Sequence, residues 1–267
     1  MGYAAGRGIQ IKIAQAALEA GVKRFYPWQF GVDYDIIGKG SAQDLFDEQI
    51  DVRQLLGGQN KTSWLIISTG MFMSFLFEEW FRVVEGLKTS DLVVRALGSW
   101  DNRVTVTSVE DIAKITARLV VDEPEIRNQV VFTAGQTISY GELTETVEKV
   151  MGVKAKREVL ELSLLKEKLE KEPDNTICKY QVLFGEGRGV AWDIEKTYNW
   201  QKGIPTTSVE QWLRRALLRV NAIRPAKVRS RDLSELAPKS HQSIQVVITS
   251  QAILQLLYEL QQPLREW

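Results

Sequence analysis

Aromatic rings and a side-chain amide gather in residues 27–35, where the chain reads P-W-Q-F-G-V-D-Y-D. The preceding residues, 22–26, are mostly apolar and predict a short buried strand, which Pro27 must end because it cannot donate to a continuing ladder. In an open parallel α/β sheet, the loops after the carboxyl ends of strands line the ligand crevice. Flat rings beside an amide suit a flat organic ligand, so the first candidate site lies in this loop. The alternative is that its rings pack the core.

The second candidate is Gln49, which lies in a predicted helix over residues 41–57. Ser41 can cap this helix and Gly57 can end it. An amide interrupts the apolar stripe along one helix face, which consists of Leu45, Gln49, Val52 and Leu56. Because an amide has no proton to exchange near neutral pH, Gln49 can orient a ligand without acting as acid or base. The alternative is a hydrogen-bonded polar residue at the helix boundary.

A third candidate follows residues 62–69, a nearly continuous apolar run typical of a strand buried on both faces of a parallel sheet. Gly70, Met71 and Phe72 come directly after it, and the chain stays rich in Phe and Met up to Trp80. Such a stripe forms either core or the wall of a hydrophobic substrate site. Both roles are compatible.

Residues 23–31 also carry a family resemblance. Their sequence K-R-F-Y-P-W-Q-F-G resembles the R-F-x-P-S-E-F-G loop of the NmrA-like and isoflavone-reductase-like proteins, which are atypical short-chain dehydrogenases that bind NADP or NAD. Trp28 and Gln29 replace the usual Ser-Glu pair. The resemblance follows the family's order of elements to about Leu217 and points to a fungal member.

The resemblance implies an α/β protein with a Rossmann-like parallel sheet in residues 1–217. A smaller C-terminal α+β substrate lobe is expected mainly in residues 70–100 and 135–217. Residues 218–267 do not resemble the family. Within them, 220–241 are basic, contain two prolines and lack periodicity, which predicts a partly disordered tail.

Site residues follow from the same resemblance. Family members place a lysine in an F-x-x-K motif, and the segment that starts at Phe46 puts Gln49 at that position, as the implied catalytic residue. The expected cofactor is NADP or NAD, and the implied cofactor-binding residues are Gly2, Tyr3, Pro27, Trp28, Gln29, Phe30, Gly70, Met71 and Phe72. Tyr34 and Phe75 are the implied substrate contacts, and no metal ligands are expected.

The start of the chain departs from the family. Residues 9–18 predict an amphipathic helix, with Ile9, Ile13, Ala16, Ala17 and Ala20 on its apolar side. In the family a strand and a G-x-x-G-x-x-G turn precede this helix and seat the pyrophosphate. We therefore expect an incomplete sheet with its first βαβ units missing, impaired NADP or NAD binding and an exposed sheet edge. Either the sequence is a truncated fragment, or a second copy or another protein covers that edge.

Composition excludes several classes of protein. With 267 residues, 44% hydrophobic and 25% charged, the chain can bury a core. Lys plus Arg and Asp plus Glu each total 34, so no net field favours nucleic acid or an anionic membrane. The sequence contains one cysteine, Cys178, and one histidine, His241. This composition argues against disulfides, zinc clusters and Ser-His-Asp triads. No secretory signal or membrane-length apolar run is present, so a cytoplasmic location is expected.

Two further motifs are better explained by a structural role than by a role in catalysis or cofactor binding. Tyr198 and Lys202 satisfy Y-x-x-x-K, the catalytic pair of ordinary short-chain dehydrogenases, but Gly203 and Pro205 follow at once and end any helix. We interpret the match as coincidence. Residues 185–189, G-E-G-R-G, do not lie between a strand and an opening helix, so they predict a turn over the substrate side.

Three functions remain open. The first is an NAD(P)H-dependent oxidoreductase acting on an aromatic or conjugated small molecule held against Phe30, Tyr34, Phe72 and Phe75. The second is a redox-sensing regulator that binds a dinucleotide and a protein partner without turnover. The third is an inactive truncated fragment. The substrate, the preference between NAD and NADP, and the oligomeric state do not follow from the sequence.

Overall fold

The computed structural model describes residues 6–89, 91–121, 123 and 125–223. Contacts divide the chain into two compact units, Met1–Leu213 and Arg214–Trp267. The predictions for Gly2, Tyr3 and the tail beyond Ile223 lie outside the described residues.

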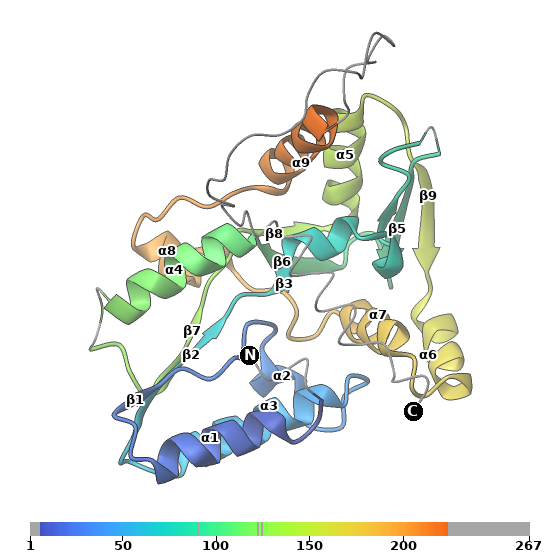
Figure 1. Ribbon diagram of the computed structural model, residues 1–267. Helices are drawn as coiled ribbons and strands as arrows, with labels where there is room; N and C mark the ends of the chain where they lie inside the picture. The colour runs from blue at the N-terminus through green and yellow to red at the C-terminus, as the bar shows by residue number, and fades with distance from the viewer. Residues whose placement is uncertain (1–5, 90, 122, 124, 224–267) are drawn as a thin grey trace, which may run out of the picture. The chain divides into compact units, whose positions relative to one another are not determined.

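The chain is a mixture of short strands and helices (Figure 1). In order, they are α1 (Ile9–Glu19), β1 (Arg24–Phe25), α2 (Tyr34–Ile37), α3 (Leu45–Gly57), β2 (Ser63–Ser68), β3 (Met71–Phe72), η2 (Met73–Phe77), η3 (Glu79–Phe81), β4 (Val84–Glu85), β5 (Val93–Leu97), β6 (Arg103–Thr107), α4 (Val109–Val121), β7 (Gln129–Phe132), β8 (Gln136–Ser139), α5 (Tyr140–Met151), β9 (Lys156–Leu160), α6 (Leu162–Lys171), α7 (Thr176–Glu186), η4 (Ile194–Lys196), α8 (Tyr198–Gln201) and α9 (Val209–Ile223).

The first sheet is parallel and has the strand order β1-β2-β7. Helices α1 and α3 lie side by side on one face, and α4 lies on the other (Figure 1). Side chains along β2 alternate between these layers, because Ile66 packs with Ala14 and Leu56 while its neighbours face α4. This two-sided burial explains the continuous apolar run of β2, and the predicted α/β fold with a parallel sheet is confirmed.

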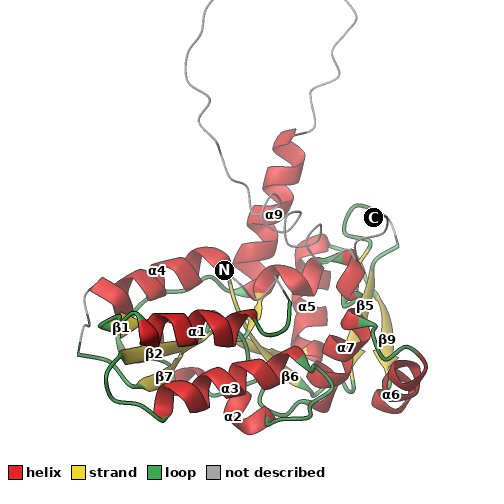
Figure 2. Ribbon diagram, turned by 60° about the horizontal axis from the view of Figure 1, so that its bottom comes forward, coloured by secondary structure: helices red, strands yellow, loops and turns green. Residues whose placement is uncertain are grey.

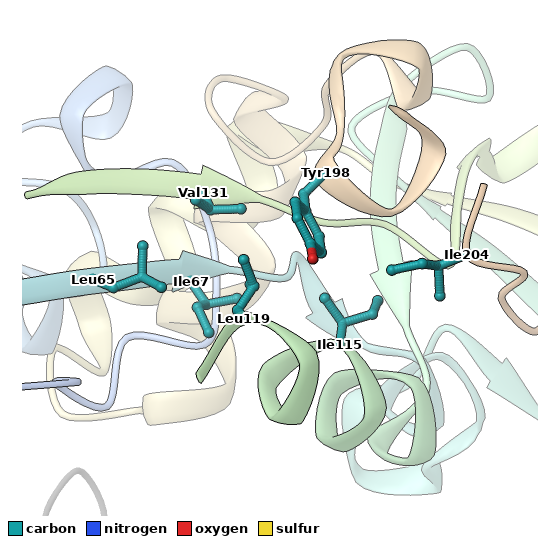
Figure 3. Packing of buried hydrophobic residues seen from close by; sticks show 7 residues of the cluster. All are labelled: Leu65, Ile67, Ile115, Leu119, Val131, Tyr198 and Ile204. Atoms are coloured by element: carbon teal, nitrogen blue, oxygen red, sulfur yellow. The ribbon is translucent and has the colours of Figure 1, made fainter. Parts of the chain in front are cut away.

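The core between β2 and α4 is shown in Figure 3. Strands β2 and β7, helix α4 and the segment around α8 contribute to it. Its buried members are Leu65, Ile67, Ile115, Leu119, Val131, Tyr198 and Ile204. Tyr26 and Phe30, on either side of Pro27, pack against this cluster, so the beginning of the candidate loop is anchored by apolar contacts.

Two smaller sheets follow (Figure 2). In one, β6 pairs in parallel with β3 and antiparallel with β8. In the other, β5 pairs antiparallel with β4 and in parallel with β9. Helix α5 begins with a capping box, in which the Ser139 side chain accepts from the Glu142 N–H and the Glu142 carboxylate accepts from the Ser139 N–H.

Two local predictions were wrong. The predicted apolar face of α1 points outward, since Ile13 is 40% exposed, whereas Gln10 and Ala14 are buried. The Glu48 carboxylate of α3 accepts hydrogen bonds from the N–H groups of Gly8 and Ile11, at 2.8 and 2.9 Å, and this contact sets how α1 is rotated. Helix α3 begins at Leu45 rather than at Ser41, whose hydroxyl donates to the Gln43 carbonyl and does not cap the helix.

One edge of the first sheet has no neighbouring strand within the described residues, because β1 pairs with β2 alone. Val22, just before β1, is 38% exposed.

None of the helices between residues 6 and 223 combines the length and the apolar character that a lipid bilayer requires.

A buried carboxylate ties α5 to β9. Glu148, 8% exposed, accepts hydrogen bonds from Lys154 Nζ at 2.8 Å, from the Ala155 N–H at 3.2 Å and from Arg157 Nη2 at 3.0 Å. Hydrogen bonds from Arg157 and Lys154 lower the pKa of Glu148 to about 2. A surface depression of about 560 Å³ lies beside this carboxylate and contains none of the predicted site residues.

Replacing Glu148 by Gln should therefore make unfolding less sensitive to acid. A carboxyl group whose pKa is lower in the folded than in the unfolded state stabilises the fold above its unfolded pKa, and that stabilisation is lost as the pH falls towards 2. We expect the Tm difference between wild type and Glu148→Gln to be largest above pH 5 and to shrink steadily down to pH 3. A constant difference across this range would contradict the assignment.

Candidate functional site

The loop 27–35 and the end of β2 are joined through one carbonyl oxygen. The N–H groups of Thr69 and Gly70 both donate to the Gly31 oxygen, at 3.1 and 2.8 Å. Because β1 and β2 run in parallel, their carboxyl ends lie at the same edge of the sheet. Two of the three candidate segments are thus neighbours.

The side chain of Gln29 connects this loop to α3, which carries the second candidate, Gln49. It is fully buried, its Nε2 donates to the Gln49 carbonyl at 2.9 Å, and its Oε1 accepts from Arg53 Nε at 2.8 Å. Only this orientation of the amide satisfies both partners. A glutamate here, as in the family motif, has no donor for the Gln49 carbonyl, so the Gln29 replacement has a structural reason.

Arg53 is a site residue that sequence reasoning missed. It is 7% exposed, it donates to Asp35 Oδ2 at 2.5 Å and to Ser68 Oγ at 3.3 Å, and its guanidinium lies 5.0 Å from the centre of the Tyr34 ring. The sequence did contain a signal for Arg53, because a residue four positions after Gln49 lies on the same helix face. A charged arginine on that face requires hydrogen-bond acceptors, and residues of the loop 27–35 provide them.

The side chain of Gln49 is buried without hydrogen bonds. It has no exposed surface, and neither Nε2 nor Oε1 finds a partner. An unpaired buried polar group costs about 1 to 3 kcal/mol, so natural structures rarely keep one without a reason. The amide leaves a donor and an acceptor without partners, which makes Gln49 the strongest candidate on chemical grounds.

Replacing Gln49 by Met should stabilise the ligand-free protein. Methionine has a similar length and no polar atoms, so the cost of the unpaired amide disappears and the free energy of unfolding should rise by about 1 to 2 kcal/mol. Urea denaturation measures this change. Gln29→Met is the control, because Gln29 is equally buried but both its amide nitrogen and its amide oxygen have hydrogen-bond partners, and its removal should destabilise the fold. A destabilised Gln49→Met variant would show that Gln49 is satisfied in solution.

The aromatic residues divide between core and site. Tyr34 is 1% exposed, lies edge-to-face with Phe46 at a centroid distance of 4.9 Å, and has its pKa raised by burial. Its predicted substrate contact stays a prediction. Trp28 and Phe30 form an edge-to-face pair at 6.1 Å. Pro27 is buried in the same loop.

A second group of aromatic rings follows β2. Met71 is buried, and Phe72 and Phe75 are half-buried, with ring centroids 5.6 Å apart. Phe75 also contacts Trp80 at 5.1 Å. The half-buried rings of this group offer apolar surface to a ligand.

The glycine-rich segment 185–189 closes over the candidate loop. The Asp33 N–H donates to the Gly189 carbonyl at 2.8 Å, and Arg188 donates to the carbonyl of Ile36 in α2. Gly187, with a φ of 69°, ends α7 in the left-handed conformation. The predicted turn is thus confined to residues 187–189, because Gly185 and Glu186 belong to α7, and its contacts with the loop are structural.

The Y-x-x-x-K pair lies elsewhere. Helix α8 ends at Gln201, the Tyr198 hydroxyl donates to Glu123 at 3.4 Å, and Lys202 pairs with the same carboxylate at 2.7 Å. Tyr198 belongs to the core cluster of Figure 3, and burial raises the pKa of its hydroxyl. Both side chains are thus paired with Glu123, a partner outside the candidate loop.

Parallel strands with helices on both faces define a Rossmann-like α/β protein, and its candidate site lies where loops converge at the carboxyl ends of β1 and β2. The chain belongs to the NmrA-like family, whose model matches residues 5–213.

Named relatives agree with this assignment. The NmrA-like family domain-containing oxidoreductase of Gibberella moniliformis is 46% identical over 208 residues, which cover 78% of this chain and 67% of that protein. Isoflavone reductase homolog P3 of Arabidopsis thaliana is 28% identical over 169 residues, or 61% of this chain. The chain spans 54% of the length of this plant relative.

Solved structures share the fold. A crystal structure of isoflavone reductase superposes with a TM-score of 0.65 at 18% identity, covering 79% of this chain and 72% of that one. The leucoanthocyanidin reductase–NADPH complex of Vitis vinifera gives a TM-score of 0.63 at 20% identity, covering 78% and 73%. At these identities the likeness concerns the fold alone.

Proposed function

We propose that this protein is an NAD(P)H-dependent oxidoreductase that acts on an aromatic or conjugated small molecule. The observation that carries the proposal is the buried, unpartnered amide of Gln49, adjacent to a loop that is joined to the end of β2. Membership of the NmrA-like family and the NADPH complex of the Vitis structure support the choice of cofactor.

The residues present fit one end of the cofactor better than the other. A nicotinamide carboxamide offers one donor group and one acceptor, which complement the two unpartnered atoms of Gln49. The start of α1 does not suit a pyrophosphate, because the Glu48 carboxylate already occupies the N–H groups of Gly8 and Ile11. Gln49 would therefore hold the nicotinamide end, and we assign no described residue to a phosphate.

Each residue then has a limited task. The bound nicotinamide supplies hydride. Gln49 orients the bound molecule by hydrogen bonds and holds no exchangeable proton, so it provides no general acid or base catalysis. Phe72 and Phe75 offer half-exposed rings against which a flat substrate can pack and exclude water.

Binding and turnover test this proposal separately. NADPH, and NADH in parallel, should quench tryptophan fluorescence in a saturable way, since Trp28 lies in the loop. Consumption of NADPH should follow when enones or quinones are added. If neither NADPH nor NADH binds in a saturable way, the proposal is refuted.

One observation favours a second function, that of a redox-sensing regulator which binds NADP or NAD without turnover. An amide at the position of the family lysine cannot exchange a proton, so binding can persist where catalysis is weak. Binding of NADPH without consumption across the whole enone and quinone panel would favour the regulator. A protein partner or second copy at the open edge of β1, and a cytoplasmic location, belong to this proposal as predictions.

A further inference from the structure

Arg53 holds the candidate loop at several points at once. Its Nε donates to Gln29 Oε1 at 2.8 Å, its Nη1 pairs with Asp35 at 2.5 Å, and its Nη2 donates to Ser68 Oγ at 3.3 Å. Ser68 Oγ in turn donates to the carbonyl of Val32 at 3.4 Å. The guanidinium therefore reaches the first, middle and last parts of the loop 27–35.

The contacts of Arg53 continue to the residue at the candidate site. Gln29 accepts from Arg53 and donates to the main-chain carbonyl of Gln49, which lies one helical turn before Arg53 on α3. The loop, the helix turn and the guanidinium thus form a closed ring of hydrogen bonds. Such a ring fixes the distance between the loop and the Gln49 backbone.

We infer that Arg53, acting through Gln29, is a positioning residue that holds loop 27–35 against the Gln49 turn of α3. The inference rests on the proposed function only for what binds there, because the hydrogen bonds themselves do not depend on a ligand. Arg53 contacts no ligand atom in this account and acts through Gln29.

A general structural role is the alternative, and Arg95 provides the comparison. It is also 7% exposed, and it pairs with Glu85 and Glu158 at 2.6 Å each. Its partners lie on β4 and β9, away from the loop. Removal of either arginine disturbs buried polar groups, but only Arg53 is joined to residues 27–35.

Hydrogen–deuterium exchange of the full chain tests the inference. The Arg53→Lys variant keeps the charge, but its single ammonium cannot reproduce the planar fork that serves Gln29, Asp35 and Ser68 together. We expect exchange in residues 27–37 to rise at least tenfold, and exchange in β5 and β9 to stay within threefold of wild type. Arg95→Lys should give the opposite pattern.

Asp35→Asn separates the exposed contact from the buried ones. The Asp35 side chain is 62% exposed, so its pairing with Arg53 is weak, and exchange in the loop should change less than threefold. Equal acceleration in all segments for Arg53→Lys, or none in the loop, would overturn the inference, because Arg53 would then be a general structural residue.

Addition of NADPH distinguishes this inference from the proposed function. In wild type, NADPH should slow exchange in residues 27–37, and Arg53→Lys should lose that protection. If NADPH protects no segment of the wild type, the proposed function fails, while the measurements without NADPH still decide the role of Arg53.

Discussion

Replacing Gly70 by Ala should destabilise the protein by about 2 to 6 kcal/mol. Gly70 has a φ of 72°, which costs an L-residue about 1 to 3 kcal/mol. An added Cβ would also lie 2.2 Å from the Thr105 carbonyl oxygen, and relief of such a clash typically costs a further 1 to 3 kcal/mol. The clash is with backbone, so no side-chain rotation can remove it.

Gly152 provides the matched control for Gly70. Its φ of 71° is nearly identical, but nothing lies within 4 Å of the position that a Cβ would take. Gly152→Ala should therefore cost only the conformational part, about 1 kcal/mol. Urea denaturation of both variants isolates the steric part, and equal losses would contradict the close approach of Gly70 to Thr105. If Gly70→Ala yields no folded protein at all, Gly70→Ala in the Gln49→Met background, which we expect to be stabilised, provides the measurement.

The second large effect concerns catalysis. Replacing Gln49 by Lys should raise NADPH turnover with quinones or enones by about 10² to 10⁴-fold, since a positioned acid or base contributes that much to a rate. An ammonium introduces an exchangeable proton where the native amide has none. Steady-state rates with saturating NADPH give the comparison.

Burial determines how the Gln49→Lys variant depends on pH. A lysine without exposed surface has its pKa lowered, so the unfolded chain binds more protons than the folded one, and stability should rise with pH between 7 and 10. Gln49→Met controls for changed packing, because it should give no rate increase. If neither variant changes the turnover of a wild type that is active, α3 is not at the reaction centre.

Local patterns predicted much of the fold. The continuous apolar run at 62–69 became the doubly covered strand β2, and α3 ended at Gly57 as expected. These features depend on neighbouring residues and on burial, which a sequence displays directly. The adjacency of the loop 27–35 and Gly70 also followed from parallel strands having their carboxyl ends at one edge.

Features decided by distant contacts were not predictable. The rotation of α1 depends on Glu48, about 40 residues further along the chain, whose carboxylate binds the first turn of the helix. Hydrophobic periodicity alone therefore selected the face of Ile13 instead of that of Ala14. The role of Arg53 likewise depends on Gln29, which lies 24 positions away.

The parallel pairings described above bear on how the chain reaches its native state. Pairing of β2 with β7 joins positions such as Leu65 and Gln129, which lie 64 residues apart, and that of β5 with β9 joins Arg95 and Glu158, 63 apart. Neither contact can form before a long loop has closed, so folding should be slow compared with that of helical proteins of similar size. Slow closure leaves β2 uncovered for longer, and low temperature or chaperone co-expression should raise the yield of soluble protein.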